Sequence, residues 1–288
     1  MCKKKINGIK LIGILLFSFG FLLLLPFSTT IKIAGETVYP FGIKPLNSTL
    51  SSLIYILWIF ISMYIYSLCF KGLFIKTYKV CVEECDPFPY IEMCEAVLGN
   101  RLIYAGRNNA SRNNAMLGLC FGYLTAGNSK AAGQVIEGIR YFPSGKAGLY
   151  NKALFFYFSF IHYLQIFDMV NVEIMLKSMM AVLQDKKFPK HRYDEMYHRY
   201  IEMQISVNIA NGDYTEAEEV FLVAFNNAKN RLGKVACQYQ LGEIYFHYER
   251  LNDAKKAFEY VISNGNKTFY VVEAVEKIDQ CVHAICRN

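Results

Sequence analysis

The sequence predicts an all-α protein in which an N-terminal transmembrane helical hairpin precedes an α-solenoid of antiparallel helix pairs. Two long uncharged apolar segments lie near the start, apolar residues recur at helical spacing from Asp86 onward, and similar sequences occur several times between residues 113 and 264. The composition fits a chain that is part membrane and part globular, because 53% of the 288 residues are apolar and only 19% are charged. An average soluble protein has about 25% charged residues, and a disordered chain needs low hydrophobicity and high net charge.

The two apolar segments run from Leu11 to Ile31 and from Leu50 to Phe70, and neither contains a charged residue. Each has the length of about 20 residues that crosses a hydrocarbon core. A soluble helix of this length would have a polar face, and neither segment has one. The first segment could instead be a cleaved signal peptide, because Lys3, Lys4 and Lys5 form a basic start. The sequence around Ala34 lacks the small residues of a cleavage site, which favours an uncleaved helix.

Lysine distribution predicts the orientation of this hairpin, since cytoplasmic flanks are rich in Lys and Arg. The loop at 32–49 has only two lysines, whereas the flanks carry Lys3, Lys4, Lys5 and Lys10 on one side and Lys71, Lys76 and Lys79 on the other. We therefore expect an integral cell membrane protein with two passes and both termini in the cytoplasm. Residues 1–79 form the membrane anchor, with helices at about 11–31 and 50–70, and residues 80–288 form the cytoplasmic domain.

The charge distribution argues against a nucleic-acid-binding protein. Nine lysines and a single acidic residue, Glu36, lie in residues 1–79, so the rest of the chain is nearly neutral although the whole carries +7. A nucleic-acid binder concentrates its basic residues on the folded domain. The sequence predicts a membrane partner and no nucleic acid.

No catalytic, cofactor or metal site is expected. The nine cysteines are odd in number and irregularly spaced, and Cys81, Cys85 and Cys94 lack the fourth ligand that structural zinc requires. The segment ending in Gly145-Lys146 lacks the full spacing of a phosphate loop. No Ser/His/Asp or Cys/His arrangement is apparent, and His162, set among many aromatic residues, is expected to be a buried, hydrogen-bonded histidine. The sequence predicts that the protein is not an enzyme.

Four places show the same order of a helix end, a turn and a second helix. A small or β-branched residue, expected to sit where the two helices of a pair approach closely, marks each second helix; these anchor residues are Ala132, Val172, Ala217 and Ala254. They are separated by 40, 45 and 37 residues. Gly212-Asp213 is expected to make one of the turns and to cap the helix that follows.

These patterns resemble the tetratricopeptide repeat (TPR) family over residues 113–264. The best matching unit is 235–264, where the residues at the family's signature positions are Leu241, Gly242, Tyr245, Ala254, Phe258 and Val261. The family's period is 34 residues, so this chain has long linkers between its units. The flanks are expected to be caps, with a helix from Asp86 to about Tyr104 and a closing helix from Thr268 to about Cys286.

The aromatic segment 153–167 leaves three interpretations open. It can be a central helix buried by its neighbours, a helix whose Tyr157 and Tyr163 line a groove, or a segment that touches the membrane surface.

The resemblance implies a membrane-anchored scaffold or adaptor whose TPR-like groove binds a partner protein or peptide. The alternative is a regulatory protein of the same fold that senses a ligand or peptide. The candidate partner-binding residues lie on the first helix of successive units and are Asn114, Tyr123, Tyr157, Tyr200 and Gln204. The oligomeric state is left open.

Overall fold

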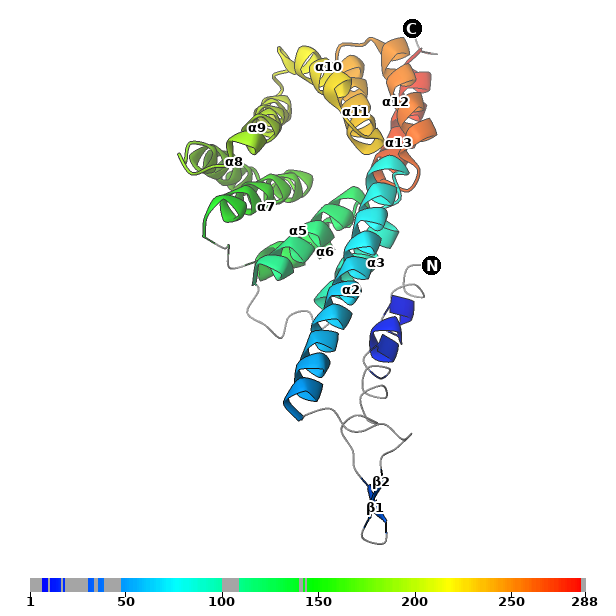
Figure 1. Ribbon diagram of the computed structural model, residues 1–288. Helices are drawn as coiled ribbons and strands as arrows, with labels where there is room; N and C mark the ends of the chain where they lie inside the picture. Colours follow the sequence, from blue (N-terminus) through cyan, green and yellow to red (C-terminus); the bar gives the residue numbers. More distant parts are fainter. Residues whose placement is uncertain are drawn as a thin grey trace. The chain divides into compact units, whose positions relative to one another are not determined.

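The computed structural model describes residues 7–9, 11–16, 18, 31–33, 36–38, 48–99, 109–139, 142 and 144–285 (Figure 1). The chain forms two compact units, Met1–Lys76 and Thr77–Asn288. The boundary expected from the sequence lay after Lys79. Within the described ranges the secondary structure is helical, apart from one short β-hairpin.

Unit 1 contains most of α2 (Ser48–Glu83), the short apolar helix Asn7–Leu16 and the two strands β1 (Ile31–Ile33) and β2 (Glu36–Val38). The strands pair antiparallel, with Ile31 opposite Val38. The first apolar segment was expected to stay helical up to Ile31, but this residue lies in β1; residue 17 and residues 19–30 of that segment lie outside the described ranges. The alternation of β-branched Ile31 and Ile33 around Lys32 is typical of a strand.

Among the described residues, one helix is long and apolar enough to cross a membrane, and it is Ile56–Glu83 within α2. Its side chains Leu57, Phe60 and Tyr64 are exposed. The short helix Asn7–Leu16 lies against α2 within unit 1: Trp58 Nε1 donates a hydrogen bond of 3.0 Å to the carbonyl oxygen of Leu16. A Cβ atom on Gly13 would lie 2.9 Å from the Tyr66 ring, so the two segments approach closely there.

Unit 2 begins with the last turns of α2 and continues with ten helices within its described residues. These are α3 (Phe88–Leu98), α5 (Asn109–Thr125), α6 (Ser129–Gly138), α7 (Lys146–Gln165), α8 (Met169–Leu183), α9 (Lys190–Ala210), α10 (Ala217–Asn227), α11 (Arg231–His247), α12 (Leu251–Gly265) and α13 (Phe269–Ile285). Each of α5 to α12 packs against the next helix in the chain, and α5, α7 and α9 also pack side by side. α3 ends at Leu98, earlier than the expected Tyr104, which itself lies outside the described residues.

The same turn joins α5 to α6, α7 to α8, α9 to α10 and α11 to α12. In each turn one residue has positive φ: Gly127 (76°), Phe167 (59°), Gly212 (84°) and Glu249 (57°). The next residue donates its backbone N–H to the carbonyl five residues earlier, at 2.8 to 2.9 Å, as Asn128 does to Tyr123. Together with the bond from the positive-φ residue to the carbonyl three residues earlier, this is the Schellman motif that closes a helix C-terminus.

The anchor residues occupy equivalent places after these turns. Each lies five positions after the positive-φ residue, and Ala132, Val172, Ala217 and Ala254 are all at most 1% exposed. Close approach of the paired helices is visible between α11 and α12, where a Cβ on Gly242 would lie 2.6 Å from the Phe258 ring. Small side chains at such crossings allow the helices to pack at native density.

The turn at Gly212 forms as expected, but Asp213 does not cap the following helix. Its carboxylate accepts hydrogen bonds from the backbone N–H and the hydroxyl of Thr215, at 3.0 and 2.6 Å. α10 therefore begins only at Ala217, after Glu216. A local Asx turn has taken the oxygen that an N-cap would have used.

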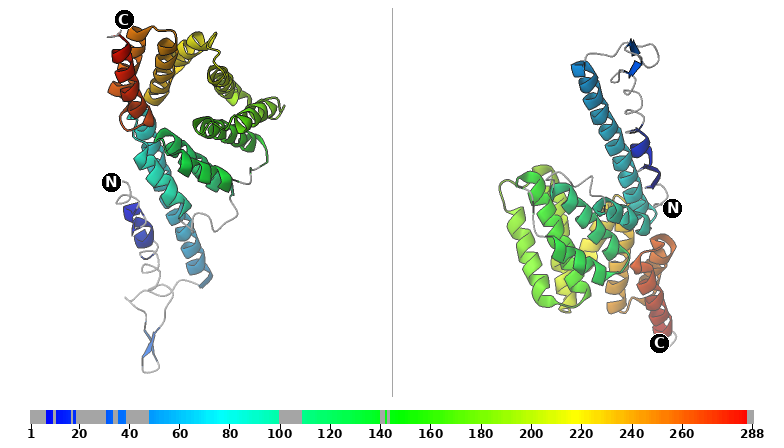
Figure 2. Two further views of the ribbon diagram at one scale, coloured as in Figure 1. Left: turned by 180° about the vertical axis from the view of Figure 1, so that it is seen from behind. Right: turned by 90° about the horizontal axis from the view of Figure 1, so that it is seen from below.

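Unit 2 closes on itself through contacts between its first and last helices. The turn between α12 and α13 meets the end of α2: the backbone N–H of Lys267 donates to the carbonyl of Cys85 at 3.1 Å, and Lys267 Nζ pairs with Asp86 at 2.6 Å. A shared apolar core joins Val82 and Cys85 to helices α11, α12 and α13. Figure 2 shows the helices following a curved path that brings α13 back beside the end of α2. We call the contacts of residues 266–269 with residues 84–86 and 127 the seam.

Candidate functional site

α9 carries a stripe of charged residues directly beside its buried apolar face. Arg192, Glu195, Arg199 and Glu202 follow one another at spacings of three and four, which places them on one face of the helix. The adjoining face carries Met196 and Met203, which are at most 1% exposed and pack in the core with α7 and α8. The buried methionines fix the rotation of α9 and so direct the charged stripe toward the tyrosines of α7.

The charged stripe and two tyrosines of α7 form a connected set of contacts. The Arg199 guanidinium lies 4.7 Å from the centre of the Tyr157 ring, and its Nη2 lies 3.6 Å from Glu195 Oε1. Arg192 Nη1 donates a hydrogen bond of 3.0 Å to Glu195 Oε2. The Arg192 guanidinium also lies over the Tyr150 ring, with its carbon 5.1 Å from the ring centre. The Tyr150 hydroxyl donates to Glu195 Oε1 at 3.3 Å. One carboxylate therefore organises two guanidinium groups and a phenol.

Tyr270 extends the set to the last helix. α13 packs on α11 and α12, yet the phenol of Tyr270 lies within electrostatic range of Tyr157 on α7 and Glu202 on α9. Its ring centre lies 5.5 Å from that of Tyr239 on α11. Residues from α7, α9, α11 and α13 are thus near enough for their charges to interact. We call Tyr150, Tyr157, Arg192, Glu195, Arg199, Glu202, Tyr239 and Tyr270 the inner cluster.

Burial controls the protonation of the inner cluster. It raises the pKa of Tyr157 to about 12, and the Glu202 charge adds to this effect against the opposing Arg199. Burial also raises the pKa of Tyr270. It raises the pKa of Glu202 as well, although the positive charge of the nearby Arg199 opposes that second shift. The phenols consequently remain hydrogen-bond donors at neutral pH.

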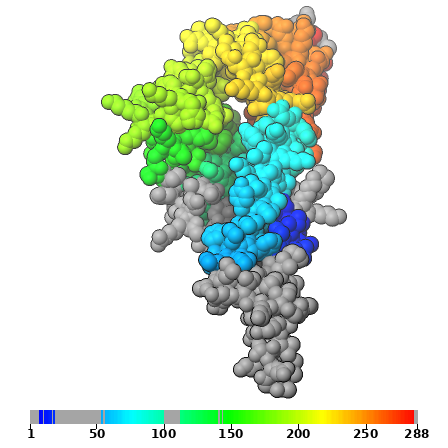
Figure 3. All heavy atoms as spheres, in the orientation of Figure 1, coloured from blue at the N-terminus to red at the C-terminus, as the bar shows by residue number. Residues whose placement is uncertain are grey.

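The inner cluster retains surface that a ligand can reach. The side chain of Arg199 is 32% exposed and that of Glu195 is 37% exposed, although tyrosines of α7 stand beside both. Figure 3 shows one face of the molecule, with a hollow bordered by atoms of α9 and α10 in yellow-green and yellow. The available chemistry is a guanidinium, carboxylates, phenol donors and aromatic ring faces.

The structure places one of the five candidate residues, Tyr157, in the inner cluster. Asn114 is exposed on α5 and accepts a hydrogen bond of 2.6 Å from Asn151 of α7. Tyr123 lies on another face of α5, where its hydroxyl donates to Glu95 of α3 at 2.7 Å. These contacts hold helices together and do not form one surface with Tyr157.

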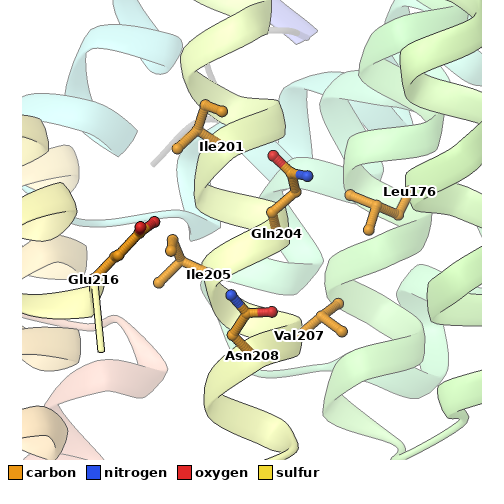
Figure 4. A pocket seen from close by; sticks show the side chains of 7 residues that line it. All are labelled: Leu176, Ile201, Gln204, Ile205, Val207, Asn208 and Glu216. Carbon is orange, nitrogen blue, oxygen red and sulfur yellow. The ribbon is translucent and has the colours of Figure 1, made fainter. Parts of the chain in front are cut away.

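Tyr200 and Gln204 lie on a different face of α9. The Tyr200 ring stacks on Tyr197, with centres 6.2 Å apart, and packs on the core beside α8. Gln204 lines a small open pocket of about 210 Å³ together with Leu176 of α8 and Asn208. Figure 4 shows Gln204 and Asn208 projecting from the same side of α9 there. The five candidates thus fall on separate surfaces, because several of them pack between helices.

Sequence reasoning missed Arg199, Glu202 and Tyr270. The spacing of Arg192, Glu195, Arg199 and Glu202 was visible in the sequence, but a charged helical stripe usually faces solvent. Tyr270 could not be found, because only the closed path of unit 2 brings α13 opposite α7. His162 is a buried histidine as expected: it is 9% exposed, and its Nδ1 lies 2.9 Å from Ser129 Oγ.

Within the described ranges, no group of three or more His, Cys, Asp or Glu residues is placed to hold a metal ion. The seven cysteines in those ranges are free, and all except Cys69 are buried. Burial raises the pKa of Cys120 and that of Cys237 to about 12, so these thiols are poor nucleophiles at neutral pH.

No protein-family model, no curated protein and no solved structure matches this chain. The class of protein must therefore be inferred from the fold and the inner cluster. The fold consists of paired helices joined by recurrent turns, and the cluster consists of guanidinium, carboxylate and phenol groups with aromatic ring faces.

Proposed function

We propose that the chain is a membrane-anchored protein–protein interaction module, a scaffold or adaptor, whose TPR-like helix pairs bind a partner protein or peptide. The observation that carries this proposal is the fourfold recurrence of one turn, followed each time at the same distance by a fully buried anchor residue. Units of this kind cannot bury their apolar faces alone, so they stack and form extended concave surfaces. The protein is proposed not to be an enzyme.

The inner cluster is the proposed binding surface. Aromatic rings and Arg are the residue types that dominate binding energy at protein interfaces. Tyr157 and Arg199 already contact each other at 4.7 Å, so little side-chain entropy is lost when a peptide is bound. Arg199 and Glu195 keep exposed polar atoms that can pair with groups of the peptide.

The proposed anchor is a two-pass membrane hairpin with both termini in the cytoplasm. α2 contains a segment that is long and apolar enough to span, and its contacts with Leu16 and Gly13 favour a paired arrangement with the first apolar segment. The lysine bias of the flanks supports the orientation. Anchoring raises the effective concentration of the domain toward partners at the membrane, so a modest affinity suffices.

A second candidate is a regulatory protein that senses a small ligand or peptide. The seam favours it, because contacts between residues 266–267 and 84–86 join the two ends of unit 2, which an open array of helix pairs would leave free. The two candidate functions differ in the size of the molecule that the protein binds.

Affinity purification of the tagged full-length protein from its native membranes, followed by mass spectrometry, tests the main proposal. We expect a stoichiometric protein partner with the wild type and with the control variant Glu219→Lys, which changes an exposed residue on α10. The double variant Tyr157→Ala/Arg199→Glu should lose it. A chain that purifies without a partner contradicts the scaffold function and favours the sensor. The same conclusion follows if a small molecule stabilises the protein and no partner protein does.

Topology is tested separately with a Thr37→Cys variant in intact cells. The proposed orientation predicts that a membrane-impermeant maleimide labels this cysteine without lysis. Labelling only after lysis contradicts the external placement of the loop.

A further inference from the structure

α13 ends unit 2 within its described residues and has one face that packs and one that does not. The packed face contains Ala274 and Cys281, both fully buried against the core that α11 and α12 share with α13. Lys277 on this side pairs with Glu243 of α11 at 2.9 Å. These contacts fix which side of α13 points outward.

The outward side carries a stripe of valines. Val272 is 64% exposed, Val275 46% and Val282 39%. Their positions, three and then seven residues apart, place them along one line of the helix. Figure 2 shows α13, in red, at the margin of unit 2, and among the described helices of that unit it packs on α11 and α12. Exposed apolar surface of this kind often marks an interaction site.

Two acidic residues lie beside the valine stripe. Glu276 and Asp279 are exposed, and neither of them forms an ion pair with a described residue. The one lysine between residues 272 and 283 is Lys277, whose charge is already paired with Glu243. The outer face of α13 is therefore apolar along one line and negative beside it.

We propose that the outer face of α13, formed by Val272, Val275 and Val282 with Glu276 and Asp279, binds a basic amphipathic helix of a partner protein. Such a helix places its apolar line on the valines and its Lys or Arg residues beside the two carboxylates. Helices recognise one another in this way through apolar anchors at helical spacing. Charge complementarity selects the partner and speeds association.

The same charges disfavour other occupants of this face. A second copy docked antiparallel on α13 would bring two pairs of carboxylates together, which costs free energy. The cytoplasmic leaflet carries negative charge and attracts basic segments, so it repels an acidic face. This face shares no residue with the inner cluster, although the charge of Glu276 acts on Tyr239.

A peptide-binding experiment on the full-length protein in phosphatidylcholine nanodiscs tests the proposal. The probe is a fluorescein-labelled 18-residue helix with Leu at helical spacing and Lys elsewhere, and a second probe has every Lys replaced by Glu. Anisotropy is read against empty nanodiscs. We expect the Lys probe to bind the wild type and the Glu probe not to bind.

Charge reversal provides the decisive comparison. The variant Glu276→Lys/Asp279→Lys should bind the Lys probe at least tenfold more weakly and should gain binding of the Glu probe. Val272→Ser/Val275→Ser should also weaken the Lys probe, whereas the control Glu219→Lys/Glu249→Lys, which reverses two exposed charges elsewhere, should not. Arg199→Glu should leave this binding unchanged, which separates it from the proposed function of the inner cluster.

Three results would overturn the proposal. One is equal binding of the Lys probe to the wild type and to the α13 charge-reversed variant. Another is binding of the Glu probe to the wild type. The third is efficient disulfide crosslinking of two Val275→Cys chains within one nanodisc, which would assign the face to a second copy.

Discussion

Asn266 donates a hydrogen bond of 2.8 Å from its side-chain amide to the carbonyl oxygen of Glu84, a residue 182 positions earlier. Asn266 itself has positive φ, at 48°, a conformation that Asn tolerates better than most residues. The bond belongs to the seam, in which the turn before α13 meets the turn after α2. The two ends of unit 2 are thereby held together.

The seam can be tested at Gly127, which has a φ of +76° and packs directly against Phe269. A Cβ at this position would lie 2.7 Å from that of Phe269, whereas a Cβ on Gly212, at φ +84°, would meet nothing within 4 Å. Gly127→Ala should therefore lose about 2–4 kcal/mol of unfolding free energy, from backbone strain and overpacking together. Gly212→Ala should lose only the strain, about 1–2 kcal/mol. Chemical denaturation of the full-length protein in mild detergent measures both; equal losses would mean that Phe269 does not pack there.

Close pairing of α11 and α12 predicts a second stability difference. A Cβ on Gly242 would lie 2.6 Å from the Phe258 ring, so Gly242→Ala should destabilise by about 1–3 kcal/mol through overpacking, even though Ala is the better helix former. Gly233→Ala on the same helix is the control, because its nearest neighbour would be 3.3 Å away. We expect that variant to be neutral or stabilised by up to about 1 kcal/mol. Thermal unfolding of the two variants should therefore shift in opposite directions or by clearly different amounts.

Phe167 occupies a turn position where two equivalent turns have glycine. Its φ is +59° and its side chain is 85% exposed, so it bears strain of about 1–3 kcal/mol without compensating burial. Phe167→Gly should raise the unfolding free energy by about 1 kcal/mol, after the greater entropy of the unfolded glycine chain is subtracted. Phe167→Ala retains the strain and should give no gain. A loss of stability in the glycine variant would show that the Phe167 ring makes a stabilising contact.

His162 predicts a dependence of stability on pH. Burial lowers the pKa of His162, and its hydrogen bond with Ser129 only partly opposes this. The unfolded state then binds the proton more tightly than the folded state, so this contribution to stability is present above about pH 6.5 and is lost as the pH falls below it. Urea denaturation at pH 7.5 and 5.5 should show a smaller decrease for His162→Gln than for the wild type. The exposed His283→Gln should behave like the wild type; an unchanged decrease in both variants would contradict a role for His162.

The helices of unit 2 could be predicted because their signals are local. The anchors at Ala132 and Ala254 recur with apolar neighbours at helical spacing, and Gly127 and Gly212 mark turns. The start of α10 was misjudged, since Asp213 has two possible partners and the short bond to Thr215 prevails. Phe167 was not expected at a positive-φ position, because the surrounding helices, and not its own preference, impose that conformation.

The candidate site was predictable only in part. Tyr157 was identified from its place on the first helix of a unit, but Tyr123 and Tyr200 lie against neighbouring helices, away from the inner cluster. The sequence indicates which residues share a helix face and cannot indicate how that helix is rotated within the fold. The buried methionines of α9 determine that rotation.

By itself the sequence determined the helical class, the apolar character of α2 and the positions of the paired helices, since these depend on periodicity, composition and turn residues within a few positions of one another. Only the tertiary structure decided that Asn266 meets Glu84 and that Tyr270 lies within electrostatic range of Tyr157 and Glu202. Those relationships join residues far apart in the chain. They depend on the sum of small rotations between successive helix pairs, which no local pattern records.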